Sequence, residues 1–252
     1  MNTKEPFTRV VVLISANAEW QVLSSLSGFK PLVGSSQGRM ISGETPFGEW
    51  TTRQVGEEKV LFMHGGWGKI SAAASAQYAI DHWKPQLLIN LGTCGGFTGQ
   101  VEQGKILLVE RTLVYDIIEQ MGDNDQALRY YTTDLDLSWL DKDLPPDIQR
   151  SLLVSADRDL LPEDIRRLKD RYGAIAGDWE SGAIAWVADR NHIPCLVIRG
   201  VTDLVGDGGS EAYGNYDLFI QRTREIMQKL LINLSWCIDK FFDFQEQSIK
   251  PF

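Results

Sequence analysis

The stretch RVVVLIS, residues 9–15, is a continuous apolar run of the length of one β-strand. A strand that is covered on both faces of a parallel sheet has this composition, because neither face meets water. Similar runs recur along the chain: KVLFMH (59–64), QLLINL (86–91), KILLVE (105–110) and PCLVIRGV (194–201). The pattern predicts a group of central strands that are buried on both sides.

Helical patterns lie between these runs. Residues 70–83 are rich in alanine, and Ser71 is placed to help cap the start of a helix there. Pro162 suits the first turn of another helix. Residues 216–242 carry apolar side chains at helical spacing, which predicts one long amphipathic helix. Alternating strands and helices predict an α/β fold, with a central mixed, largely parallel sheet flanked by helices.

The 252 residues contain no repeat, no low-complexity tract and no linker, so we expect a single domain over residues 1–252. A net charge of −9 without a basic stripe argues against a nucleic acid partner. No apolar run approaches the roughly 18 residues of a membrane span, and residues 1–8 lack the apolar centre of a signal peptide. These features predict a cytoplasmic protein with no membrane partner.

The three cysteines are far apart and form neither a CxxC pair nor a disulfide framework. With only three histidines in addition, their spacing gives no metal site. Neither glycine-rich segment, residues 65–68 or 92–96, matches the phosphate-binding pattern GxxxxGK[ST] or the dinucleotide pattern GxGxxG. We therefore expect neither a metal nor an organic cofactor.

In open α/β sheets, ligands bind beyond the carboxyl ends of the strands. Residues that follow the apolar runs are therefore candidates for a site; they are Glu19, the two glycine-rich segments with Trp67, Thr93 and Gly95, and the group Arg199, Thr202 and Asp203. Taken alone, each glycine-rich segment is more often a tight turn, and an aspartate after a buried strand is more often a turn or cap residue. Arg199 and Thr202 beside Asp203 favour a functional role for this acid.

Two further acids, Asp178 and Glu180, precede a helix of small residues over 181–189. The helix dipole alone explains one acid at this position. A carboxylate held there can also accept hydrogen bonds from both hydroxyls of a vicinal diol, such as the 2′- and 3′-hydroxyls of ribose.

Four segments together resemble one family, the purine nucleoside phosphorylase and methylthioadenosine/adenosylhomocysteine nucleosidase superfamily. The segments are HGGWGKISAA (64–73), INLGTCGGF (89–97), GDWESGAIA (177–185) and IRGVTDLVGD (198–207). The resemblance covers most of the chain, roughly residues 9–219, with the motifs in the order of the family.

The resemblance implies roles for individual residues. Glu180 would accept hydrogen bonds from the ribose diol, and Asp203 would protonate N7 of the departing purine. Thr202 would support the base-binding loop, while Thr93 and Arg199 would position the nucleophile. Aromatic residues would line the ribose and its 5′-substituent, although ordinary core positions explain them equally well; they are Trp67, Trp179 and Tyr216.

Phosphorylases of the family hold phosphate with arginines after the first strand and before the G-[ST]-x-G loop. This chain has residues 15–19, SANAE, at the first place and Asn90 at the second. The resemblance therefore favours hydrolysis, with Glu19 activating water, although a glutamate at a helix N-terminus has the same appearance. A phosphate-dependent phosphorylase and a non-catalytic nucleoside-binding domain remain alternatives.

The resemblance implies a small-molecule nucleoside as ligand and a homodimer as the assembly. A nucleoside like 5′-methylthioadenosine or S-adenosylhomocysteine is the favoured substrate. Two departures bear on this choice. Asp159 stands where the family commonly has an aromatic residue against the base, and Trp179 replaces a smaller, methionine-like residue near the ribose.

Overall fold

The computed structural model describes residues 8–25, 41–140 and 144–249. Its strands are β1 (Val10–Ile14), β2 (Ser42–Glu44), β3 (Glu49–Val55), β4 (Glu58–His64), β5 (Leu87–Phe97), β6 (Ile106–Val114), β7 (Thr132–Asp134), β8 (Ile148–Ser155), β9 (Ala176–Asp178), β10 (Cys195–Gly206) and β11 (Gly209–Ser210). Its helices are α1 (Asn17–Ser25), α2 (Gly68–Trp83), α3 (Asn124–Tyr130), α4 (Pro162–Tyr172), α5 (Ser181–Arg190) and α6 (Tyr216–Ile249). The prediction that the first eight residues form no signal peptide concerns a segment of which residues 1–7 lie outside the described residues.

The first strand shows why the continuous apolar runs belong inside the sheet. In β1, Val10, Val12 and Ile14 face one core cluster, whereas Val11 and Leu13 face another. All five side chains are fully buried. The strand pairs in parallel with β4 on one side and β5 on the other. The predicted strand with two buried faces is thus confirmed.

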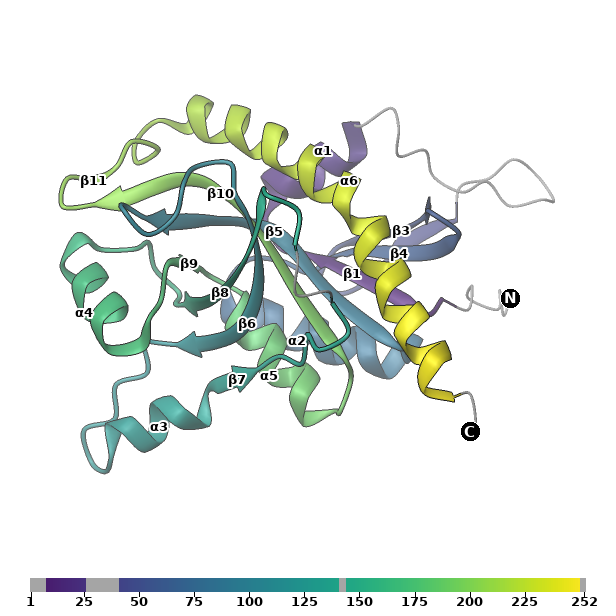
Figure 1. The fold of residues 1–252 in the computed structure, drawn as a ribbon, viewed down its shortest axis with the longest axis horizontal. Coiled ribbons are helices and arrows are strands. Elements are labelled where there is room, and N and C mark those ends of the chain that lie inside the picture. Colours follow the sequence, from purple (N-terminus) through teal and green to yellow (C-terminus); the bar gives the residue numbers. More distant parts are fainter. Residues whose placement is uncertain (1–7, 26–40, 141–143, 250–252) are drawn as a thin grey trace.

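The strands form one mixed sheet that closes on itself in part (Figure 1). β10 pairs in parallel with β5 and antiparallel with β6. The pairings of β6 with β8, β8 with β9 and β9 with β5 complete a ring of five strands. From β5 the sheet continues through β1, β4 and β3 to β2. The predicted α/β class and its mixed sheet are confirmed.

Helices cover both faces of the sheet (Figure 1). Apolar residues of α1 and α6 pack in the first cluster, with Leu23 and Leu230 as examples, while α2 and α5 pack in the second. Gly200 of β10 allows α6 to approach the sheet closely, because a Cβ atom there would lie 2.0 Å from the side chain of Ile226. The predicted long helix begins at Tyr216 and continues to Ile249. Among the described residues, no helix is both long and apolar enough to cross a membrane.

Two strands are longer than the sequence predicts. β5 runs through the glycine-rich segment 92–96, and β10 includes Thr202 and Asp203, so these residues do not form loops after the strands. The two strands pair with each other along this whole stretch, which satisfies their backbone groups. Gly96 has no side chain to crowd β10, since a Cβ atom there would lie 2.8 Å from the side chain of Val201.

The predicted cap of α2 is wrong. The helix begins at Gly68, so Ser71 lies too far inside it, and no side-chain cap comes from the preceding Trp67. Acids from distant segments bind the first free amides instead. The amide of Gly68 donates to Glu180 (3.0 Å), and the amide of Lys69 donates to Asp157 (2.7 Å).

Candidate active site

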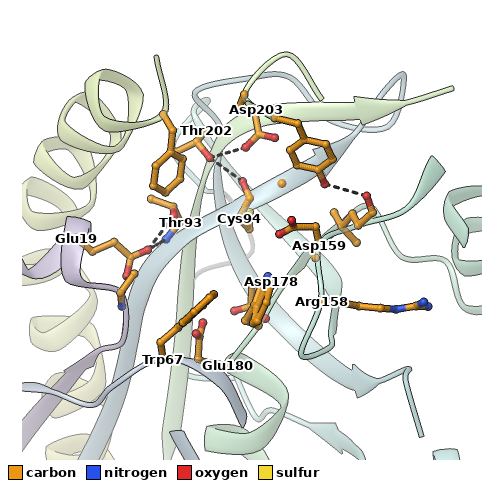
Figure 2. Close-up of a pocket in the computed structure, with 18 of the residues that line it drawn as sticks. Glu19, Trp67, Thr93, Cys94, Arg158, Asp159, Asp178, Glu180, Thr202 and Asp203 are labelled. Atoms are coloured by element: carbon orange, nitrogen blue, oxygen red, sulfur yellow. Dashed lines mark hydrogen bonds between the residues drawn. The ribbon is translucent and has the colours of Figure 1, made fainter. Parts of the chain in front are cut away.

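A pocket of about 410 Å³ lies beside the carboxyl-terminal halves of β5 and β10 (Figure 2). This volume is within the usual range for small-molecule sites. Eight of the ten predicted site residues line it: Glu19, Trp67, Thr93, Gly95, Trp179, Glu180, Thr202 and Asp203. The sheet therefore brings together residues that are up to 184 positions apart in sequence (203 − 19).

Glu19 is held in a fixed position at one side of the pocket. It stands in the first turn of α1, where 5% of it is exposed. Its Oε1 accepts hydrogen bonds from the amide of Thr93 (2.6 Å) and from its hydroxyl (2.8 Å), as Figure 2 shows. Gly92 leaves room for this contact, because a Cβ atom there would lie 2.8 Å from the same oxygen. The acid is thus both a helix N-terminal residue and part of the pocket.

Burial raises the pKa of Glu19, while the charge of Arg199 and the hydrogen bonds from Thr93 oppose this shift. A carboxylate with a raised pKa accepts a proton more readily near neutral pH than an exposed one. The environment therefore suits Glu19 to proton abstraction from a water molecule.

The acids before α5 have separate tasks. Asp178 serves the helix, because it accepts a hydrogen bond from the amide of Ser181 (3.1 Å) and another from the hydroxyl of Ser155 (2.6 Å). Glu180 makes no cap bond to α5; it lines the pocket and accepts the amide of Gly68. Only one acid is explained by the helix terminus, which leaves Glu180 available to a ligand.

Burial and the neighbouring charge of Asp178 raise the pKa of Glu180 to about 8. In the unfolded chain the ordinary value is 4.5, so the folded state holds this proton more tightly between the two values. The stabilisation from this group is fully present below about pH 4.5 and is lost as the pH rises toward 8.

We therefore expect Glu180→Gln to flatten the pH dependence of stability. Between about pH 5.5 and pH 7.5, the free energy of unfolding of the unmodified protein should fall by about 1–2 kcal/mol more than that of the variant. Urea denaturation at several pH values measures the difference. Glu246→Gln, at an exposed position of α6, is the control and should follow the unmodified protein. Parallel curves for Glu180→Gln and the unmodified protein would contradict the assignment.

Two tryptophans form one wall of the pocket. The rings of Trp67 and Trp179 are stacked, with centroids 4.7 Å apart and an interplanar angle of 27°. Trp67 is 67% exposed, so it is not a core residue, and both rings line the cavity. Such an apolar wall suits the hydrophobic faces of a ligand.

Arg199 lies behind the pocket and does not line it, which corrects the prediction that it positions a nucleophile directly. It is 2% exposed, and its Nε donates to Asp178 (2.7 Å) in a buried ion pair. Its Nη2 donates to the side chain of Asn90. Asn90, which stands where the phosphorylases of the family have their second phosphate-binding arginine, is therefore a hydrogen-bond partner of Arg199 in the core. The guanidinium acts by balancing the buried acids Glu19, Asp178 and Glu180.

Asp203 stands at the opposite side of the pocket from Glu19 (Figure 2). Its carboxylate accepts hydrogen bonds from the hydroxyls of Thr202 (2.8 Å) and Ser210. The Thr202 hydroxyl also lies 3.3 Å from the carbonyl oxygen of Cys94. A β-bulge between Val201 and Asp203 shifts the register with β5 at this point. The two hydroxyls hold the acid in one orientation toward the cavity.

The prediction that Tyr216 lines the pocket is wrong. It begins α6 and is 69% exposed, outside the lining. Tyr213, in the turn before α6, and Phe219, in its first turn, line the pocket instead. All three residues are aromatic and lie within seven positions, so the sequence alone does not show which of them line the pocket.

Within residues 8–25, 41–140 and 144–249, no group of three or more His, Cys, Asp or Glu side chains is arranged to hold a metal ion. What the pocket offers is a set of carboxylates and hydroxyls around an apolar wall, which can bind a diol and transfer protons.

Comparison with known proteins identifies the family and the fold of this chain. A 5′-methylthioadenosine/S-adenosylhomocysteine nucleosidase of Maridesulfovibrio salexigens is 28% identical over 181 residues, which cover 66% of this chain and 78% of the relative. The nucleosidase structure of Campylobacter jejuni has a TM-score of 0.66 at 15% identity, over 89% of this chain and 97% of the other. Futalosine hydrolase of Helicobacter pylori has a TM-score of 0.67 at 12% identity, over 94% and 98%. The family model of the phosphorylase superfamily matches residues 28–235, and the chain belongs to this superfamily.

Proposed function

We propose that this chain hydrolyses the N-ribosidic bond of a purine nucleoside. The observation that carries the proposal is that Glu19, Asp203 and Glu180 line one pocket at three separate places around it (Figure 2). Breaking this bond builds positive charge on the ribose and negative charge on the base. The reaction therefore needs a proton acceptor on the sugar side and a proton donor on the base side.

Each carboxylate has one task in the proposed reaction. Glu180 accepts hydrogen bonds from the 2′- and 3′-hydroxyls and so orients the ribose. Glu19, held by Thr93, takes a proton from water as its oxygen attacks the anomeric carbon. Asp203 gives its proton to N7 of the purine, so that the base leaves as a neutral molecule. Free purine and ribose are the products.

The charge of the pocket favours water over phosphate as the nucleophile. Five carboxylates line the pocket, Glu19, Asp159, Asp178, Glu180 and Asp203. Among the described lining residues, Arg158 is the one cationic side chain, and it pairs with Asp164 (2.5 Å). The described lining therefore offers phosphate no free cation to bind, and those of its acids that are ionised would repel a dianion.

We expect base release to proceed at the same rate with and without phosphate. The products, separated by chromatography, should be free purine and ribose, with no ribose 1-phosphate. The relatives named for 5′-methylthioadenosine and S-adenosylhomocysteine make nucleosides with a substituted 5′ position the first to test, together with simple purine nucleosides. Strict dependence on phosphate would replace the hydrolase by a phosphorylase. Binding of a nucleoside without any release of base would show that the chain is a non-catalytic nucleoside-binding domain.

We also propose that the chain works in the cytosol as a homodimer. Its three cysteines are free and buried, as suits a reducing compartment. Trp67 and Ile70, at the start of α2 beside the pocket, are 67% and 85% exposed and offer an apolar surface to a second copy. A monomeric mass in sedimentation at micromolar concentration would contradict the dimer.

A further inference from the structure

Three consecutive residues at the start of α2 contact three different parts of the surrounding structure. The ring of Trp67 stacks on that of Trp179, and the amide of Gly68 donates to Glu180 (3.0 Å). Both of these partners line the pocket. Lys69, the third residue, does not line the pocket, and its side chain is only 18% exposed. Its contacts therefore serve another purpose than direct binding of a ligand.

The ammonium group of Lys69 pairs with two aspartates that follow the neighbouring strands β6 and β8. It contacts Asp116, two residues beyond the end of β6, and lies 3.8 Å from one carboxylate oxygen of Asp157, two residues beyond the end of β8. The backbone amide of Lys69 donates to the other oxygen of Asp157 (2.7 Å). The amide of Asp157 in turn donates to Asp116 (3.0 Å). Each of the three residues, which we call the Lys69 cluster, thus contacts the other two.

Asp157 stands at the start of a segment that reaches the part of the pocket around Asp203. Three positions later, Leu160 lines the pocket. Leu160 lies near Asp203, because a Cβ atom added at Gly95 would lie 3.1 Å from the side chain of Leu160 and 3.9 Å from the carboxylate of Asp203. The Lys69 cluster therefore joins the start of α2, which holds Glu180, to the segment beside the proposed proton donor.

We propose that Lys69 is a positioning residue, whose ammonium group fixes the distance between the part of the pocket around Glu180 and the part around Asp203. The inference rests on the proposed nucleosidase function, in which one nucleoside contacts both parts at once. An ammonium ion is a compact charge with three donors, so it can hold two carboxylates from different segments in place. A fixed distance matters because a misplacement of about 1 Å, caused by a residue far from the reacting atoms, can cost about 10²-fold in rate.

The test compares ligands that contact both parts of the pocket with a ligand that contacts one. In Lys69→Met, kcat/KM for the best purine nucleoside should fall at least about tenfold. The Kd of a C-nucleoside, which cannot be hydrolysed because a carbon atom joins its base to the ribose, should rise by a similar factor. The Kd of the free purine base should change by less than about threefold, because the distance between the two parts does not enter its binding. The fluorescence of the tryptophans in the pocket wall measures both Kd values.

Further variants separate positioning from a general loss of structure. Lys69→Arg keeps a positive charge with several donors and should recover most of the affinity for the C-nucleoside. Asp116→Asn removes one charge of the cluster and keeps the shape of the side chain. It should weaken the C-nucleoside more than the free base, and it tests the inference even if Lys69→Met does not fold. Lys169→Met, at an exposed position of α4, is the control and should change the binding of neither ligand.

The difference between the two ligands decides the outcome. Equal weakening of the C-nucleoside and the free base in Lys69→Met and Asp116→Asn, or no weakening of either, overturns the positioning role. If no base is released from any nucleoside while the difference in binding still depends on Lys69, the proposed hydrolysis is contradicted and the positioning role stands.

Discussion

Replacing Asp203 by asparagine is expected to lower kcat by about 10²–10⁴-fold, the usual contribution of a positioned general acid. Asparagine has nearly the same shape, and its amide can still exchange hydrogen bonds with the hydroxyls of Thr202 and Ser210. What it cannot do is give a proton to N7 of the purine. Steady-state rates of base release, with circular dichroism as a check on folding, measure the effect.

A substrate that needs no proton separates this role from a structural one. An N7-methylated purine nucleoside already carries positive charge on its base, so Asp203→Asn should slow its hydrolysis far less than that of the parent nucleoside. Asp207→Asn, at an exposed position just beyond β10, is the matched control and should keep normal rates. If Asp203→Asn stays within tenfold of the unmodified protein on ordinary substrates, the acid lies elsewhere.

Replacing Arg199 by methionine is expected to destabilise the fold by about 3–5 kcal/mol, because it leaves a buried carboxylate without its cation. Methionine keeps much of the length of the side chain and removes the charge. Asp178, its ion-pair partner, is then left in the core, and the buried acids Glu19 and Glu180 lose the charge that balances them. Urea denaturation at neutral pH gives the change in the free energy of unfolding.

Two further variants show whether the loss comes from the buried charge. Adding Asp178→Asn to Arg199→Met removes the unpaired acid and should recover part of the stability. Arg111→Met breaks an ion pair with Asp134 in which both side chains are more than half exposed, and it should cost at most about 1 kcal/mol. A loss below about 1 kcal/mol for Arg199→Met itself would show that the buried pair contributes little.

Local patterns predicted most elements because their causes are local. The run over residues 9–15 is apolar at every position of β1, and the helical spacing after Tyr216 reflects contacts of α6 with one face of the sheet. The ring of strands was not predictable in the same way. It depends on β10 pairing with both β5 and β6, and pairings between strands distant in sequence leave no periodic trace.

The candidate site was likewise predictable only where the cause is local in sequence. Glu180 and Asp178 are both acids before α5, and only their contacts separate the helix cap from the pocket residue. Arg199 was grouped with Asp203 because it precedes it on one strand, yet it points into the core. The sequence shows Asp159 only as the replacement of an aromatic residue of the family, and its place in the pocket lining follows from the structure alone.

The β-bulge in β10 places Arg199 and Asp203 on opposite faces of the same strand. Residues four apart on a regular strand share a face, so Arg199 and Asp203 would otherwise lie on the same side. Val197, Val201 and Leu204 pack in the same core cluster. Val201 and Leu204 are three positions apart, whereas residues on one face of a regular strand are an even number apart, so the alternation of faces shifts by one residue between them. One extra residue therefore lets a single strand direct Arg199 into the core and Asp203 into the pocket.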